Sequence, residues 1–342
     1  MLKLLRRLLL PFSALYWLIT AIRNLLYDWG VYTSHSFPLP VIAVGNLSTG
    51  GTGKTPQTEY LIRLLGDRYR IATLSRGYGR KTNGFIIANE NAAAQTIGDE
   101  PYQFYSKFPN ITVAVDANRV NGVTNLLNLN PKPEIILLDD AYQHRRLKAG
   151  FYILLTAYSE IYPDDFILPA GNLRESRTGA HRANVIVVTK CPPDLSDTEQ
   201  QRIIKKLKPK PSQKVFFTCI DYDDLVYSEK GVLHIDDATQ TQRVLVAGIA
   251  KPQYFFEVLA GPGTINKQYP DHHEFTETEL NELNQLANER IIITTEKDYT
   301  RLKGKLPADS LYYLPISSMF INGGDDFDNT ILTYVGKSTA NR

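Results

Sequence analysis

A glycine-rich segment near the start of the chain has the residue types and spacing of a phosphate-binding loop. It follows the apolar run 40–44 and comprises Ser48, Thr49, Gly50, Gly51, Thr52, Gly53, Lys54 and Thr55. Glycines let backbone N–H groups turn toward phosphate oxygens, the lysine can reach the β- and γ-phosphates, and the threonine hydroxyl can ligate Mg²⁺. The apolar run before the loop and the amphipathic stretch 58–65 after it supply the expected strand and helix. The segment therefore predicts a nucleoside triphosphate site, and a glycine-rich turn with a stray lysine is the structural alternative.

Two adjacent carboxylates, Asp139 and Asp140, follow the apolar run 135–138. A strand that ends in aspartate is common, but with an upstream phosphate loop it is where a magnesium ligand is expected. Mg²⁺ on nucleotide phosphates keeps several waters and takes one or two carboxylates. Because neighbouring residues in an extended chain point in different directions, we expect the two aspartates to have different roles.

Other polar residues have both a structural and a chemical interpretation. Asp99 precedes the helical pattern 102–108 and suits an N-cap, but a transferase that acts on a hydroxyl also needs a group to accept its proton. His272 and His273 have no cysteine partners at zinc spacing, so solvated loop histidines are the default expectation. The charged segment 294–298 follows an apolar run and is expected to be a solvated strand end.

The composition narrows the class of protein. At 342 residues the chain is long for a single core, so two domains are expected. The net charge of +2 is too small to indicate nucleic-acid binding through bulk electrostatics. The two cysteines, Cys191 and Cys219, have neither a disulfide-framework nor a zinc spacing, which indicates a reducing, cytosolic setting.

The first thirty residues differ from the remainder. Basic residues at 3, 6 and 7 precede the uncharged run 8–22, which Pro11 interrupts and which is shorter than the roughly twenty residues needed to span a bilayer. Apolar residues recur at three- and four-residue steps from Leu4 to Leu26, a pattern typical of a helix that lies in a membrane interface. A spanning helix and an ordinary packed helix remain alternatives, and a signal peptide lacks a clear cleavage site.

Apolar runs alternate with helical patterns through most of the chain, which predicts an α/β fold with a mostly parallel sheet and helices on both faces. The pattern changes around 213–236, where two extended segments flank a turn at 228–231. A second α/β unit begins near 243. The sequence therefore predicts a larger and a smaller unit joined by a linker.

Taken together, several sequence segments of the chain resemble those of the tetraacyldisaccharide 4'-kinase (lipid A 4'-kinase) family of Gram-negative bacteria. The matching segments occur in order along the chain and are 44–56, 74–80, 98–101, 138–145, 168–175, 271–273 and 294–298. Ser48 stands where the general P-loop pattern has its first glycine, and this departure is itself typical of the family. Ala141 and Tyr142 stand where Gly-Phe is expected, a change that leaves the charged positions untouched.

This resemblance implies transfer of the γ-phosphate of ATP, with Mg²⁺, to the 4'-hydroxyl of a tetraacyl glucosamine disaccharide 1-phosphate in lipid A biosynthesis. It implies a peripheral or monotopic enzyme at the cytoplasmic face of the bacterial inner membrane. The expected partners are the acylated disaccharide lipid and the membrane surface, with no nucleic acid and no obligate protein partner. A membrane-associated P-loop ATPase switch without phosphoryl transfer, or a tethered binding module with a structural nucleotide, is the alternative.

The implied architecture is a P-loop three-layer α/β/α domain plus a second, smaller α/β domain, joined by a two-stranded linker. On this chain the expected parts are an N-terminal membrane-associating helix in 1–30, the kinase domain in 31–214, the linker hairpin in 215–240 and the C-terminal α/β domain in 241–342.

Site residues follow from the resemblance, position by position. The implied catalytic group is Lys54, Asp99, Asp140 and His272. The implied metal ligands are Thr55, Asp139 and Glu175. Contacts with phosphate or disaccharide are implied for Arg76, Arg119 and His144. In this assignment Asp99 is the general base paired with Asp140, and His272 reaches the site from the second domain.

Overall fold

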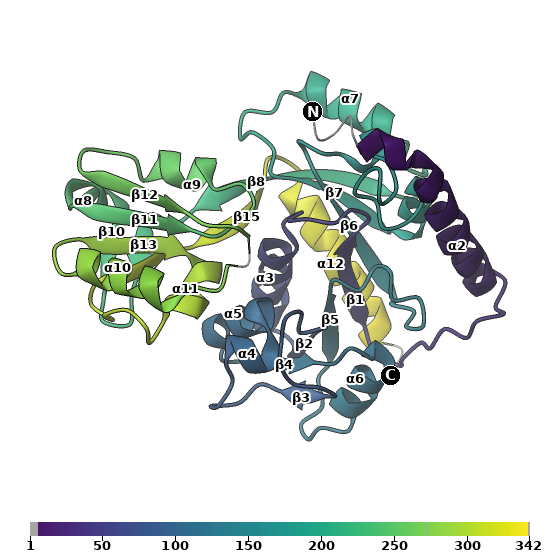
Figure 1. Cartoon of the computed structure of the whole chain (residues 1–342). Coiled ribbons are helices and arrows are strands. Elements are labelled where there is room, and N and C mark those ends of the chain that lie inside the picture. Colours follow the sequence, from purple (N-terminus) through teal and green to yellow (C-terminus); the bar gives the residue numbers. More distant parts are fainter. Residues whose placement is uncertain (1–5, 272, 341–342) are drawn as a thin grey trace.

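The computed structural model describes residues 6–271 and 273–340, and these form two α/β units, each built on its own sheet (Figure 1). The strands of the larger sheet are β1 (Val41–Asn46), β2 (Ile71–Ser75), β3 (Ile86–Ile87), β4 (Thr112–Val115), β5 (Ile135–Asp139), β6 (Phe151–Ala157), β7 (Val185–Thr189), β8 (Lys214–Tyr222) and β15 (Ile316–Phe320). Their order in space is β15-β8-β7-β6-β1-β5-β2-β4-β3.

The centre of the larger sheet is parallel. Strand β1 pairs with β5 on one side and β6 on the other, and β2, β5 and β7 are, like β1, buried along their whole length. Continuous apolar strands of this kind must be covered on both faces. Because β1 lies between β5 and β6, the loops that follow these three strands open at the same edge, which is where ligands bind in open α/β sheets.

Helices cover both faces of this sheet and complete the predicted three layers. One face packs against α3 (Lys54–Gly66), α5 (Asp99–Lys107) and α12 (Gly324–Ala340). The other face packs against α6 (Arg119–Leu127) and α7 (Asp197–Leu207). The sequence prediction of an α/β fold with helices on both faces is confirmed.

The smaller unit repeats this architecture on six strands. Its strands are β9 (Leu225–Tyr227), β10 (Val232–His234), β11 (Arg243–Ala247), β12 (Thr264–Gln268), β13 (Ile291–Thr295) and β14 (Leu311–Leu314), in the order β10-β9-β14-β13-β11-β12. Its helices are α8 (Ile235–Gln240), α9 (Gln253–Val258), α10 (Glu277–Ala287) and α11 (Glu296–Leu302). Apolar clusters lie on both faces of the sheet.

The two units are joined by strands that are distant in the sequence. Strand β8 leads out of the first unit and β15 leads back, and the two pair antiparallel from Thr218 opposite Phe320 to Tyr222 opposite Ile316. The predicted hairpin around 228–231 does form, between β9 and β10, but it belongs to the smaller sheet. Assigning all of 241–342 to the second unit is therefore wrong for the last strand and helix, because α12 buries Phe327 in the core of the first unit (Figure 1).

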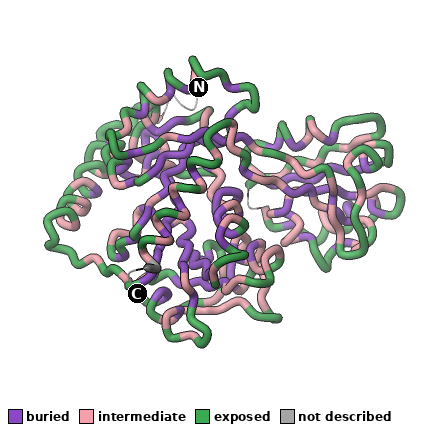
Figure 2. The backbone as a smooth tube through the Cα atoms, turned by 180° about the vertical axis from the view of Figure 1, so that it is seen from behind, coloured by how far each residue is buried: buried purple, intermediate pink, exposed green. Residues whose placement is uncertain are grey.

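The N-terminal helix is turned with its apolar side outward. Residues Arg7–Asp28 comprise η1 (Arg7–Leu9) and α2 (Leu10–Asp28), long and apolar enough to cross a membrane by length and composition, with 11% of the apolar window buried. The buried side is polar: Ser13 donates to the carbonyl oxygen of Ile167 at 3.0 Å, and the Tyr16 hydroxyl donates to that of Arg174 at 3.1 Å. Leu8, Phe12, Leu15 and Ile19 are at least 58% exposed, and the helix is largely green in Figure 2.

Candidate active site

The glycine-rich loop lies between β1 and the first turn of α3, as the sequence predicts. Gly50 and Gly53 have φ angles of 109° and 79°, a left-handed conformation that side chains disfavour. The helix begins at Lys54, and no side chain caps its N-terminus. The backbone N–H groups of a helix N-terminus attract anions, so the loop has the form of a phosphate cradle.

Asp140 is held between two cations at the end of β5. The Lys54 Nζ lies 3.7 Å from its Oδ1, and Arg174 donates to its two oxygens at 3.1 and 3.2 Å. Burial by itself would raise the pKa of Asp140, but the charges of Lys54 and Arg174 lower the pKa below its ordinary value. Asp140 therefore stays ionised and fixes the Lys54 ammonium beside the loop. Arg174 lies in a segment that matched the family, but nothing in the sequence pairs it with Asp140.

Asp139 is the buried carboxylate of this site. It is 6% exposed, and its Oδ1 has no hydrogen-bond partner among the described residues. Burial raises the pKa of Asp139 to about 7, against the opposing charge of Lys54. A buried carboxylate oxygen without a partner is costly unless a ligand satisfies it. Asp139 and Thr55, in the first turn of α3, thus have donor chemistry that fits a nucleotide-bound Mg²⁺.

Strand β7 braces the loop from the other side. The Thr189 hydroxyl donates to the Thr52 carbonyl oxygen at 2.9 Å. The next residue, Lys190, has a φ of 58°, and its Nζ lies 3.7 Å from where a Cβ on Gly51 would stand. A second ammonium group therefore lies over the loop. Its sequence signal, a lysine after an apolar strand, is too common to identify it.

Asp99 lies where the two units meet. It is the first residue of α5, and the N-cap position belongs to Gly98 without any side-chain cap, so the N-cap interpretation of Asp99 is wrong. Arg301 of α11, in the second unit, donates to both carboxylate oxygens of Asp99. The two side chains are 16% and 10% exposed.

The histidine pair is only partly described. His272 lies outside the described residues, so its predicted place in the site stays a prediction. His273 is not the solvated residue that the sequence suggests: its Nε2 lies 2.9 Å from Glu279, and its ring stacks on Tyr269 at 4.9 Å between centroids. Its carbonyl oxygen accepts from Arg301 at 3.3 Å, so this loop lies beside the Asp99 contact.

Glu175 lies in a buried ion pair, although the family resemblance implies a metal ligand. The residue is 0% exposed. Its two oxygens accept from Arg182 at 2.8 and 2.9 Å, and further bonds come from Asn24 at 2.9 Å and Gln143 at 3.1 Å. With both oxygens already engaged, the carboxylate joins α2 to the first unit, and the structure does not support the metal role.

Arg119 is likewise buried, contrary to the contact with phosphate or disaccharide that the resemblance implies. It is 1% exposed, and it donates to the carbonyl oxygens of Asp116 at 2.7 Å and Asp139 at 3.4 Å. Burial lowers the pKa of Arg119 to about 10, which still leaves it charged at neutral pH. A fully enclosed guanidinium can support Asp139 from behind but cannot touch a large substrate in this arrangement.

Arg76 and His144 do lie near one another, in a cationic cluster. Arg76 is exposed and His144 is half-buried. Burial lowers the pKa of His144 to about 4, and the positive charges of Arg119, Arg76, Arg23 and Arg146 act in the same direction. His144 is therefore neutral, and the surrounding arginines form a region suited to an anion. Arg23 belongs to α2, so this region adjoins the exposed apolar helix.

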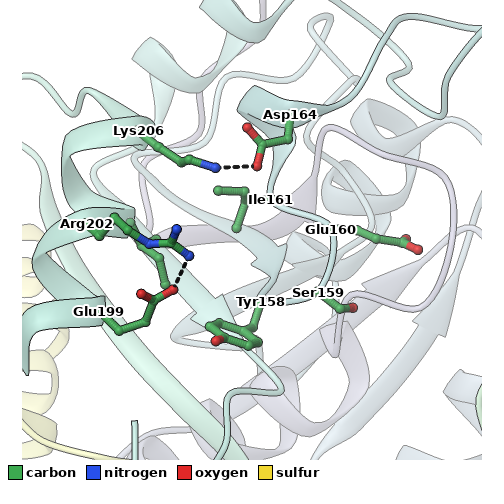
Figure 3. A pocket seen from close by; sticks show the side chains of 9 residues that line it. Tyr158, Ser159, Glu160, Ile161, Asp164, Glu199, Arg202 and Lys206 are labelled. Carbon is green, nitrogen blue, oxygen red and sulfur yellow. Dashed lines mark hydrogen bonds and ion pairs between the residues drawn. The ribbon is translucent and has the colours of Figure 1, made fainter. Parts of the chain in front are cut away.

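Two cavities flank the site without containing the phosphate loop. One, of about 220 Å³, lies between α7 and the segment after β6, and the pairs Lys206–Asp164 (2.8 Å) and Arg202–Glu199 (2.6 Å) line it (Figure 3). The other, of about 400 Å³, lies at the end of α2 and includes Arg146 of the cationic cluster. Among the described residues, no group of three His, Cys, Asp or Glu side chains could hold a metal by itself.

The central strand of this parallel sheet leads through a glycine-rich loop into a helix, and aspartates stand at the end of the adjacent strand. This is the architecture of P-loop nucleotide-binding proteins. The chain is a protein of this class.

Within the class, it belongs to the tetraacyldisaccharide 4'-kinase family, because the family model described as tetraacyldisaccharide-1-P 4'-kinase matches residues 5–335. The chain is 58% identical over 333 residues to the tetraacyldisaccharide 4'-kinase of Flavobacterium johnsoniae, covering 97% of this chain and 98% of that protein. It is 41% identical over 357 residues to that of Bacteroides thetaiotaomicron, covering 97% and 94%. Among solved structures it resembles the "apo" form of LpxK from Aquifex aeolicus in complex with ATP, with a TM-score of 0.77, 31% identity, and 97% and 99% of the two chains covered.

Proposed function

We propose that this chain transfers the γ-phosphate of ATP to the 4'-hydroxyl of a tetraacyl disaccharide 1-phosphate, a reaction of lipid A biosynthesis. The observation that carries the proposal is the buried Asp139 oxygen without a partner, next to a phosphate loop whose lysine is held by Asp140. Family membership over residues 5–335 supplies the acceptor.

Each group then has a task. The loop N–H groups and Lys54 bind the β- and γ-phosphates, and Lys190 adds a second positive charge above the loop. Thr55 and Asp139 would hold Mg²⁺, which would neutralise charge that develops on the transferred phosphoryl group. Asp140 keeps Lys54 in place, and Arg174 keeps Asp140 in place. Asp99 accepts the proton of the attacking hydroxyl. The family resemblance also implies a part for His272, which lies outside the described residues.

The cationic cluster binds the phosphate that the acceptor already carries. Arg76 is exposed, while Arg23 and Arg146 lie close enough to act on the charge of His144. Neutral His144 can offer one ring N–H to a phosphate oxygen without adding charge. Because Arg23 is part of α2, an acceptor held here would have its acyl chains next to the exposed apolar side of that helix.

Helix α2 holds the enzyme on the cytoplasmic face of the inner membrane. Its outward apolar side and its inward polar side, fixed through Ser13 and Tyr16, fit a helix that is bound both to the protein and to lipid. Removal of residues 1–28 should abolish flotation with anionic liposomes while ATP binding persists. If the truncated and full-length proteins float equally, the membrane contact lies elsewhere.

A transfer assay with γ-labelled ATP, with and without the disaccharide 1-phosphate lipid in detergent micelles, tests the proposed activity. We expect label in the lipid and little ATP turnover without it, and Lys54→Ala should lower transfer by about 10²–10³ because it removes a charge that stabilises the transition state. ATP hydrolysis that is independent of the acceptor would instead favour the ATPase switch. No turnover in either case would favour a binding module.

A further inference from the structure

Helix α11 of the second unit lies against α5 of the first (Figure 1), and ion pairs join the two helices. Lys107 of α5 lies 2.5 Å from Glu296 of α11, and Glu100 lies 4.0 Å from Lys297. The pair between Arg301 and Asp99 is different in kind, since it engages the proposed general base. A residue outside the P-loop unit thus holds the group that would take the substrate proton.

The Arg301 guanidinium is itself fixed within the second unit. Its Nη1 donates to the His273 carbonyl oxygen at 3.3 Å and lies 3.7 Å from Oδ1 of Asp298. The Asp298 side chain is 0% exposed, and it accepts from the Gly248 N–H at 2.7 Å and the Thr295 hydroxyl at 2.8 Å. The Arg301 guanidinium is therefore held in one orientation toward Asp99 by contacts within the second unit.

One edge of the Arg301 guanidinium faces the two carboxylate oxygens of Asp99. Its Nε is 3.4 Å from Oδ1 of Asp99, and a second nitrogen donates to Oδ2. Two roughly parallel N–H···O bonds from one edge of a guanidinium restrict the rotation of the carboxylate that accepts them. Arginine does not deprotonate in proteins, so it cannot replace Asp99 as the base. The pairing fixes the plane of the carboxylate.

We propose that Arg301 is a positioning residue for phosphoryl transfer: it sets the orientation of Asp99, and it does so only while the second unit stands against the first. The inference rests on the proposed role of Asp99 as the base. It adds that the second unit takes part in proton transfer through α11, and that the base is assembled from both units.

The test compares Arg301→Gln and Arg301→Lys with Glu296→Gln, a matched change in the same helix that contacts Lys107 and not Asp99. All are measured as full-length folded enzyme, with ATP and the disaccharide 1-phosphate lipid varied separately. Misplacement of a reacting group by about 1 Å costs on the order of 10²-fold in rate, so Arg301→Gln should lower kcat about 10²-fold and change KM for ATP by less than about threefold. Arg301→Lys should recover part of kcat, because it keeps the charge but not the paired N–H groups of the guanidinium. Glu296→Gln should keep kcat.

A double-mutant cycle decides whether Arg301 acts through Asp99. In an Asp99→Asn background, Arg301→Gln should have less than about a threefold further effect, because the group that it positions is gone. An undiminished effect in that background would overturn the proposal, as would equal behaviour of Arg301→Gln and Glu296→Gln, which would make Arg301 an ordinary interface contact. Full activity of Asp99→Asn alone would instead remove the proposed base itself, and the positioning role with it.

Discussion

The ends of strands β5 and β13 look alike in sequence and differ in the structure. Both are parallel strands with a carboxylate at the carboxyl end: Asp139 is the last residue of β5, and Glu296 follows β13 directly as the first residue of α11. Burial raises the pKa of both residues to about 7. Yet Oδ1 of Asp139 has no partner among the described residues, whereas Glu296 accepts from Lys107 at 2.5 Å and from the Ile316 N–H at 3.3 Å.

The difference teaches that a perturbed pKa does not by itself locate a site. Carboxylates in structural ion pairs and carboxylates in catalytic sites can both be buried, and in both cases the pKa can be shifted. What separates Asp139 from Glu296 is hydrogen bonding: Lys107 and the Ile316 N–H engage the two oxygens of Glu296, whereas one oxygen of Asp139 has no partner among the described residues and can accept a ligand. Glu175 provides a third case, since it is as buried as the others and fully bonded.

The largest effect is expected at Asp139. Asp139→Asn should lower kcat by about 10²–10³, because it removes charge that would hold Mg²⁺ on the transferred phosphate. The free energy of unfolding should not fall, since the amide has the same shape as the carboxylate. It also removes the unfavourable free energy of burying a carboxylate oxygen without a partner. Steady-state kinetics and thermal unfolding on the same preparation measure both. A stability loss with unchanged kcat would place Asp139 with the structural carboxylates and break the comparison.

Glu175→Gln should show the opposite pattern. The change removes the charge that neutralises Arg182, which is only 20% exposed, and disrupting one side of a buried pair costs about 3 kcal/mol. We expect a lower midpoint in urea and a kcat per folded molecule within about tenfold of the parent. Retained stability with a kcat loss like that of Asp139→Asn would restore the metal role that the family resemblance implies for Glu175.

Local segments were predictable from the sequence, and long-range partners were not. The phosphate loop and the buried strands are set by neighbouring residues, so glycine spacing and apolar runs identify them. The pairing of β8 with β15, the return of α12 to the first core and the contact of Arg301 with Asp99 join residues roughly a hundred to three hundred positions apart. No local pattern records such contacts. The family resemblance likewise implies a metal ligand at Glu175 and a phosphate or disaccharide contact at Arg119, but it does not reveal that Arg182 pairs with Glu175 or that Arg119 donates to the Asp116 carbonyl oxygen.

Removal of Mg²⁺ should sharpen the comparison further. A ligand at about 100 times its Kd stabilises the folded state by about 2.7 kcal/mol, so ATP with Mg²⁺ should raise the Tm of the parent protein more than ATP with EDTA. Asp139→Asn should lose this difference, and Glu296→Gln should keep it. If both variants keep it, Asp139 is not a ligand of the metal. If both lose it, the second unit affects the metal site.

The smallest effect is expected at Glu296, and it should appear in the pH dependence of stability. Glu296 and Glu59 share the single ammonium of Lys107, at 2.5 and 2.8 Å. Burial, followed by the charge of Glu59, raises the pKa of Glu296 from 4.5 to about 7. The folded protein thus holds a proton that the unfolded chain releases, so this contribution is fully present below about pH 4.5 and is lost as the pH rises toward 7.

In the Glu296→Gln variant the side chain at this position is uncharged at every pH. Relative to the parent, its free energy of unfolding should therefore rise by about 1–3 kcal/mol between pH 5 and pH 8. Urea titrations at the two pH values measure this, with Glu282→Gln as the control, because Glu282 forms a similar pair with Lys267 but is 51% exposed and should show almost no pH-dependent difference. If the two variants respond alike, Glu296 is ionised in the fold like a surface carboxylate, and burial without a ligand would no longer distinguish β5 from β13.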